Sequence, residues 1–176
     1  MLKKILCAID GSDQAEKAAQ WASVLAQKFE AELILLFVAP HRIAPPELRR
    51  MAESEHLVRP SAPAPPPVSP QPGMPSRWSS EDLSQNAAIS ATIYQELGER
   101  LVEAARWQAE SAGVGKVTGL VEDGDPAHRI VEIAKRENVD LIVMGRRGLG
   151  DLKALLLGSV THKVAQAATC ACLTVE

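Results

Sequence analysis

Three stretches of the sequence are continuously apolar, and each ends in a break that leads into a helical pattern. They are residues 5–9, 33–38 and 141–144. A short run without polar alternation is typical of a strand covered on both faces, as in a parallel sheet. Two less regular strands, with helices between them, give the order β-α-β-(insertion)-α-β-α-β-α-β. Because parallel strands need right-handed crossovers, this order predicts a doubly wound five-stranded parallel sheet, an α/β fold with helices on both faces.

The helical segments have recognisable boundaries. After Gly11-Ser12, apolar residues recur at three- and four-residue steps as far as Phe29, and Ser12 or Asp13 can cap that helix. A long helix is expected from near Leu83 to Gly113, and Asp125-Pro126 opens another that ends near Arg136. The buried face expected for the long helix consists of Ile89, Ile93, Leu97, Leu101, Ala104 and Ala105.

The two remaining strands carry weaker patterns. Residues 116–122 have no cleanly apolar face and include Gly119, which suits a strand near the edge of the sheet. Residues 172–175 form the fifth strand. Asp140 is expected to open the strand that leads into the glycine-rich segment.

The middle of the chain differs in composition from the rest. Eleven of the twelve prolines lie between about residue 39 and residue 82. Proline lacks the amide donor and blocks helix interiors, so we expect an extended, partly polyproline excursion there, with a short helical turn near residues 47–55. The excursion is either a tolerated loop insertion or a proline-rich recognition segment. We therefore expect a single domain over residues 1–176 with a Pro-rich insertion at about 39–82.

Composition excludes several classes of protein. A net charge of −3 argues against nonspecific nucleic-acid binding, and no stretch reaches the roughly 18 apolar residues that span a bilayer. The N-terminal segment does not have the pattern of a signal peptide, so a cytoplasmic location is expected. The three cysteines are too few for a disulfide framework, and we interpret Cys7, Cys170 and Cys172 as small apolar residues.

Residues 145–161, GRRGLGDLKALLLGSVT, link a buried strand to a helix start. Glycine allows a ligand to approach the backbone closely, and Ser159, just after Gly158, suits an N-cap. The open N–H groups of such a helix start attract anions, phosphate above all. Strand, loop and helix together favour phosphate binding over the alternative of an ordinary loop closed by a capped helix.

The spacing Gly-x2-Gly-x9-Gly-Ser, formed by Gly145, Gly148, Gly158 and Ser159, resembles the ATP-binding signature of the universal stress protein family. The segment ILCAIDGS resembles that family's first strand and its acidic residue, here Asp10. The resemblance covers roughly residues 1–38 and 83–176. It implies strand order 3-2-1-4-5, ATP binding, and a homodimer paired through the last strand, residues 173–175.

With that strand order, the ligand crevice lies between the first and fourth strands, where Asp10 and Gly145 converge. Asp10 is placed to accept a ribose hydroxyl or to help hold a divalent cation such as Mg²⁺ or Mn²⁺, or else it caps the first helix. Arg146, Arg147 and Lys153 would add positive charge near the anion. The expected nucleotide-binding residues are Ala8, Ile9, Asp10, Val38, Met144, Gly145, Arg147, Gly148, Gly158, Ser159, Val160 and Thr161.

Other nucleotide chemistries fit the sequence less well. No lysine stands between Gly158 and Ser159, as a Walker A motif would require, and the dinucleotide fingerprint breaks at Lys153. The four histidines suggest no catalytic or metal-binding set, and no residue stands out to orient an attacking water. We expect an ATP-binding regulatory module rather than an efficient enzyme. A slow ATPase or adenylyl-handling enzyme, a cyclic-AMP-binding module, and a scaffold with a vestigial site remain as alternatives.

Overall fold

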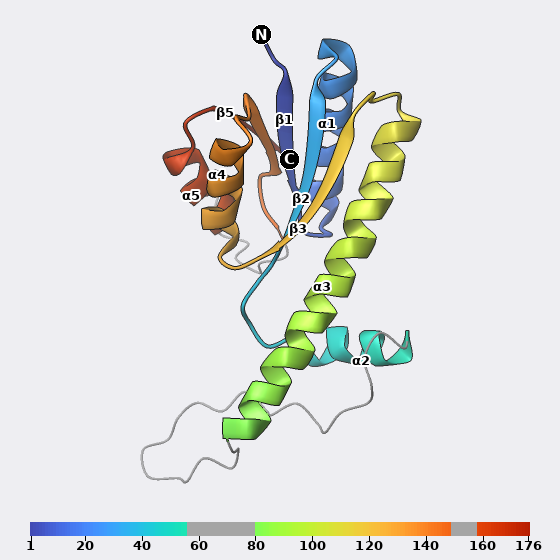
Figure 1. Ribbon diagram of the computed structural model, residues 1–176, viewed down its shortest axis with the longest axis vertical. Helices are drawn as coiled ribbons and strands as arrows, with labels where there is room; N and C mark the ends of the chain where they lie inside the picture. The colour runs from blue at the N-terminus through green and yellow to red at the C-terminus, as the bar shows by residue number, and fades with distance from the viewer. Residues whose placement is uncertain (56–79, 149–157) are drawn as a thin grey trace. The chain divides into compact units, whose positions relative to one another are not determined.

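The computed structural model describes residues 1–55, 80–148 and 158–176. The chain divides into two compact units, one made of residues 1–40 and 97–176 and the other of residues 41–96. The first unit holds the sheet (Figure 1). Most of the proline-rich segment falls on residues 56–79, outside the described residues. Its expected extended conformation therefore stays a prediction.

The sheet has five parallel strands in the order β3-β2-β1-β4-β5, which confirms the predicted fold class and strand order. The central strand β1 pairs with β2 on one side and with β4 on the other. Among the described strands, β3 lies at an edge of the sheet beside β2, as its weak apolar pattern predicted. The bounds are β1 Lys4–Ile9, β2 Glu32–Ala39, β3 Val117–Asp123, β4 Leu141–Gly145 and β5 Ala171–Val175.

Within the first unit, helices lie on both faces of the sheet (Figure 1). Helices α1 and α3 border one face, and α4 and α5 pack together on the other. Among the described helices, none is both long enough and apolar enough to cross a bilayer. The bounds are α1 Asp13–Phe29, α2 Pro46–Ser54, α3 Ser80–Ser111, α4 Pro126–Arg136 and α5 Ser159–Ala167.

Local sequence explains how α1 and α4 begin. Ser12 caps α1 with its Oγ, which accepts a hydrogen bond from the Ala15 N–H at 3.2 Å. Asp125 caps α4 in the same way through the His128 N–H at 3.0 Å, and Pro126 occupies the first helical position. A capped helix start therefore follows closely after the end of β1.

Two glycines allow α3 to lie close to the sheet. A Cβ built on Gly98 would stand 2.4 Å from the Phe37 ring, and one on Gly119 would stand 2.3 Å from Cγ1 of Val102. Glycine on the helix faces a large side chain on β2, and glycine on β3 faces a valine on the helix. This close approach is why Gly119, which weakens the strand pattern, is nevertheless suited to its position.

The expected buried face of α3 is only partly correct. Ile93 is buried, but Ala104 is exposed, and Leu101 is only half-buried. Nearer the sheet, the buried positions of α3 include Gly98 and Val102. They face the sheet because Gly98 lies against Phe37 and Val102 lies against Gly119.

In the unit of residues 41–96, α2 confirms the short helix expected near residues 47–55. Arg49 of α2 is 5% exposed and donates to Oδ1 of Asn86 at 2.7 Å. The Ser90 hydroxyl accepts the Ala44 N–H at 3.0 Å. Asn86 and Ser90 are thus buried polar residues of α3, and they are satisfied by partners that an apolar pattern cannot reveal.

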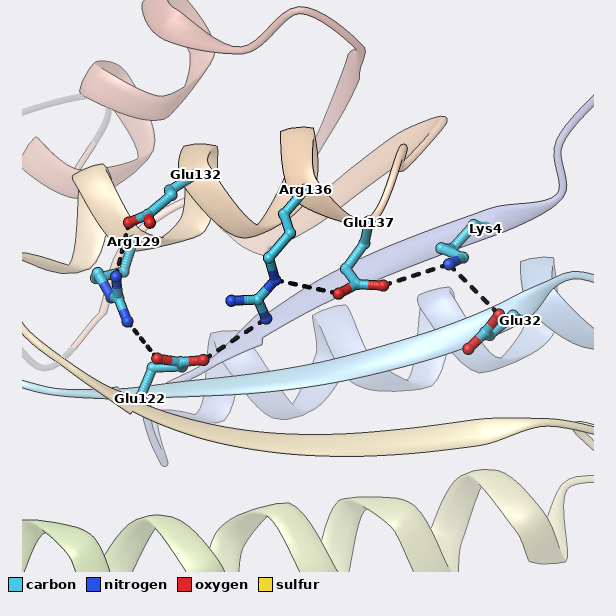
Figure 2. Close-up of polar contacts among 7 residues, drawn as sticks. All are labelled: Lys4, Glu32, Glu122, Arg129, Glu132, Arg136 and Glu137. Carbon is cyan, nitrogen blue, oxygen red and sulfur yellow. Dashed lines mark hydrogen bonds and ion pairs between the residues drawn. The ribbon is translucent and has the colours of Figure 1, made fainter.

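On the α4 face, a chain of ion pairs links strands β1, β2 and β3 to α4 and the residue that follows it (Figure 2). Glu122 of β3 pairs with Arg129 and also with Arg136, at 3.7 Å. At the other end, Lys4 lies 3.7 Å from Glu32 and 3.5 Å from Glu137. These side chains are part-exposed, so each pair adds little stability alone, but together they cover the sheet beside α4. The participants are Lys4, Glu32, Glu122, Arg129, Glu132, Arg136 and Glu137.

Candidate functional site

The carboxyl ends of β1 and β4 lie next to each other in the sheet. Ala8 of β1 is in register with Met144 of β4, so Asp10 and Gly145 follow from neighbouring strands. Ala8, Val38 and Met144 belong to the apolar cluster on the α4 and α5 side, and Ile9 is also buried. At these four expected positions the side chains serve the core, which leaves the backbone as the part that could contact a ligand.

Asp10 lies directly against the glycine turn. A Cβ built on Gly148 would stand 2.1 Å from Oδ2 of Asp10, so only glycine fits there without a shift. Oδ1 of Asp10 accepts hydrogen bonds from the Ser12 N–H at 3.0 Å and from the Ser12 hydroxyl at 2.6 Å. Asp10 therefore braces the cap residue of α1 rather than capping the helix itself. Two segments distant in sequence meet at this carboxylate.

The first turn of the glycine segment is held by hydrogen bonds from three directions. The Arg146 N–H donates to the Val175 carbonyl at 2.6 Å, and the Arg147 N–H donates to Oε1 of Gln14 at 2.8 Å. The Arg146 carbonyl accepts the Gly158 N–H at 2.9 Å. These three backbone donors are therefore already used within the protein, and a bound anion would have to find other partners.

Such donors are present at the start of α5. The Gly158 carbonyl accepts the first helical hydrogen bond, from the His162 N–H at 2.9 Å, so Gly158 is the N-cap and Ser159 the first helical residue. The expectation that Ser159 is the N-cap was wrong by one position. Within the described part of the chain, nothing accepts from the N–H groups of Ser159, Val160 or Thr161. This is the open, positive end of a helix.

Thr161 has a second role at this helix start. It is 5% exposed, and its hydroxyl donates to the Gly145 carbonyl at 3.0 Å. The hydroxyl therefore ties α5 to the end of β4, whereas the exposed Ser159 hydroxyl has no such structural bond among the described residues.

The cations expected near an anion are only partly placed there. Arg146 forms an ion pair with the Glu176 carboxylate, which draws its charge toward the end of β5. Arg147 is half-buried, and its Nε is shielded from solvent with no hydrogen-bond partner in the described part of the chain. Lys153 lies outside the described residues. The Nε of Arg146 is likewise shielded and has no partner among the described residues, so the two arginines differ in the ion pair that Arg146 makes with Glu176.

The histidines do not converge on this site. His128 is exposed and lies 3.8 Å from Glu132, and His162 is exposed in the first turn of α5. His41 is exposed in the other unit, and His56 lies outside the described residues. Among the described residues, no three His, Cys, Asp or Glu side chains are grouped to hold a metal ion.

The cysteines are unpaired and belong to the packing of the sheet. Cys7 is fully buried in β1, and burial raises the pKa of its thiol to about 12. Cys170 and Cys172 are half-buried against the apolar cluster, and burial raises the pKa of both thiols. Thiols held in this neutral form are poor nucleophiles.

Sequence reasoning missed two residues that organise the site, Gln14 and Glu176. Gln14 holds the Arg147 N–H, and Glu176 holds the Arg146 side chain. Neither residue belongs to an apolar stripe or to a recognisable motif. The available signal was position: Gln14 lies in the first turn after Asp10, and Glu176 directly follows the last strand.

Comparison with known proteins agrees with this geometry. The model of the universal stress protein family matches residues 1–65 and 63–176. The chain belongs to the universal stress protein family. Universal stress protein YxiE of Bacillus subtilis is 34% identical over 176 residues, which cover all of both chains. Universal stress protein UspA from Lactobacillus plantarum has the same fold, with a TM-score of 0.74, 19% identity, and coverage of 99% of this chain and 97% of its own.

Other solved structures with the universal stress protein fold hold adenine nucleotides. One is a universal stress protein in complex with cAMP (TM-score 0.59, 23% identity, 99% and 97% of the two chains covered). Another, from Arabidopsis thaliana, has AMP bound (TM-score 0.55, 18% identity, 98% and 90% covered). At these identities the likeness establishes the fold of the present universal stress protein.

Proposed function

We propose that this universal stress protein binds an adenine nucleotide, ATP by preference, in the crevice between the carboxyl ends of β1 and β4. The observation that carries the proposal is the convergence of the Asp10 carboxylate with Gly148, beside N–H groups at the start of α5 that have no acceptor among the described residues. A carboxylate suits a ribose hydroxyl, and an open helix start suits phosphate. The adenine-nucleotide complexes of proteins with this fold support the same choice of ligand.

The twelve expected residues divide by role in this proposal. Gly145 and Gly148 allow the nucleotide close to the backbone, and Gly158 shapes the turn into α5. The N–H groups of Ser159, Val160 and Thr161 bind the outer phosphates, and Arg147 adds positive charge. Asp10 takes the ribose, while the backbone of Ala8, Ile9, Val38 and Met144 borders the base.

A divalent cation fits this site only as a companion of the phosphates. Asp10 is the carboxylate at the glycine turn, and Mg²⁺ or Mn²⁺ is commonly held by one or two carboxylates together with phosphate oxygens. The protein then acts as a cytoplasmic regulatory module whose contacts change with nucleotide occupancy. It pairs with a second copy through residues 173–175 of β5, whose outer side has no partner strand in the described sheet.

Calorimetric titration of the purified protein with ATP and Mg²⁺ tests the proposal. We expect saturable binding to the wild-type protein, with at least tenfold weaker binding by Asp10→Ala and unchanged binding by Asp13→Ala. Asp13 is an exposed acid in the same helix start, so it controls for loss of charge and for local helix effects. Equal affinities for all three proteins, or no binding at all, would refute the assignment.

Cyclic AMP is the competing ligand that a solved complex specifically favours. A parallel titration with cAMP separates the two ligands, because only ATP has outer phosphates for the N–H groups of α5. Slow hydrolysis is a separate question, answered by measuring phosphate release with the same protein.

A further inference from the structure

A side-chain hydrogen bond attaches the glycine turn to α1. Gln14 lies in the first turn of α1, and its Oε1 accepts the Arg147 N–H at 2.8 Å across 133 residues of sequence. The contact is part-buried. A backbone donor between Gly145 and Gly148 therefore has its partner on α1.

The packing around this bond leaves little freedom. A Cβ built on Gly145 would stand 3.0 Å from Cβ of Gln14 and 2.8 Å from the Arg147 carbonyl oxygen. One step further along, Gly148 lies against Asp10. The glycine segment thus meets Gln14 in the first turn of α1 and Asp10 just before that helix.

These two contacts are linked by hydrogen bonds at the start of α1. Asp10 is fixed by its two hydrogen bonds from Ser12, and Ser12 caps α1 through the Ala15 N–H. Gln14 follows in the same turn. While Gln14 accepts the Arg147 N–H, the start of α1 therefore sets the distance between the Asp10 carboxylate and the glycine segment.

We propose that Gln14 is a positioning residue of the nucleotide site: it fixes the glycine turn at the distance from Asp10 that a bound nucleotide requires. This inference rests on the proposed function and adds a residue to it. Gln14 acts through the Arg147 N–H and need not touch the ligand. Without it, the Arg147 N–H loses its protein partner, and the turn can move away from Asp10 before a nucleotide binds. Part of the binding free energy must then be spent on restoring the turn.

The test compares the wild-type protein with Gln14→Met, Gln14→Glu and Gln20→Met. Methionine keeps the length of the side chain but removes the acceptor, and glutamate restores an acceptor oxygen. Gln20 is an exposed glutamine on the same helix, so Gln20→Met controls for the helix and for the chemistry of the substitution.

The first measurement is amide hydrogen exchange at Arg147 in the nucleotide-free protein. We expect Gln14→Met to speed exchange at this amide at least tenfold, with Gln14→Glu and Gln20→Met close to wild type. Exchange at the Ile5 and Leu6 amides of the central strand should stay the same in all four proteins. Unchanged Arg147 exchange in Gln14→Met would overturn the proposal, whatever the protein binds.

The second measurement is ATP affinity in the presence of Mg²⁺. We expect Gln14→Met to bind about five- to tenfold more weakly than wild type, the effect of one lost hydrogen bond to a part-buried group, while Gln20→Met binds equally. Wild-type binding with an unaffected Gln14→Met would overturn the positioning role alone. Failure of the wild-type protein to bind ATP would overturn the proposed function and the role of Gln14 in it together.

Discussion

The contact between Asp10 and Gly148 leads to a prediction whose size can be worked out. Alanine at position 148 would place its Cβ 2.1 Å from Oδ2 of Asp10, well inside any real carbon–oxygen contact. Asp10 is short and is fixed by two hydrogen bonds from Ser12, so it cannot turn away without breaking them. If the turn moves instead, the bond between the Arg147 N–H and Gln14 is strained.

Either response breaks one or two hydrogen bonds, each with a net value of about 1 kcal/mol. We therefore expect Gly148→Ala to destabilise the nucleotide-free protein by about 1 to 2 kcal/mol. For a chain of this length that corresponds to a fall of about 2 to 8 °C in melting temperature. Differential scanning calorimetry without nucleotide measures it directly.

Gly115→Ala is the matched control. A Cβ at Gly115 meets nothing within 4 Å, and neither Gly115 nor Gly148 has a left-handed backbone. Both substitutions reduce the conformational entropy of the unfolded chain equally, so the difference between them isolates the contact with Asp10. Equal melting temperatures for the two variants would refute the close approach of the glycine turn to Asp10.

Three further predictions concern the frame around the site. Cys7 should resist thiol reagents until the protein unfolds. Because burial raises the pKa of its thiol to about 12, this thiol ionises at a lower pH in the unfolded chain than in the folded protein. The free energy of unfolding should therefore decline above about pH 9, which a pH series of urea titrations would show. Asp140→Ala should lower stability at neutral pH, because the Lys3 and Lys4 backbone N–H groups bond the Asp140 carboxylate and lower its pKa in the folded protein. The stability that this carboxylate contributes is present above its pKa in the unfolded chain and is lost as pH falls through its pKa in the folded protein. The melting temperatures of variant and wild type should therefore converge in acid. Gly119→Ala should cost about 1 to 3 kcal/mol in urea titration, because its Cβ would meet Val102 at 2.3 Å, and Val102→Ala in the same chain should restore part of the loss.

Much of the fold was predictable because the strands carry uninterrupted apolar runs. The runs at residues 5–9, 33–38 and 141–144 mark β1, β2 and β4, and the alternation with helices fixes a parallel sheet. The meeting of Asp10 with the glycine turn also follows, since parallel strands bring their carboxyl ends to one edge. Even the uncertain third strand was placed correctly at an edge.

The features that the sequence did not predict depend on contacts that no local sequence pattern encodes. Asn86 and Ser90 are buried with partners from Arg49 of α2 and from Ala44, which precedes that helix. Ala104 is exposed although it continues an apolar stripe. The N-cap of α5 is Gly158 rather than Ser159, because the helix begins where the Gly158 carbonyl can accept the His162 N–H. The role of Gln14 depends on a bond to a residue 133 positions away.

Buried apolar residues pack against both faces of the sheet, and ion pairs add to this packing beside α4. On one side, α1 lies against the strands through a stripe of buried alanines, where short side chains allow close dispersion contact. On the other, Glu122 and its arginines complete the covering beside α4 (Figure 2). Salt screens the attraction between part-exposed charges but has little effect on dispersion contacts between methyl groups. Rising ionic strength should therefore weaken the ion pairs beside α4, while the apolar packing on both faces of the sheet is scarcely affected.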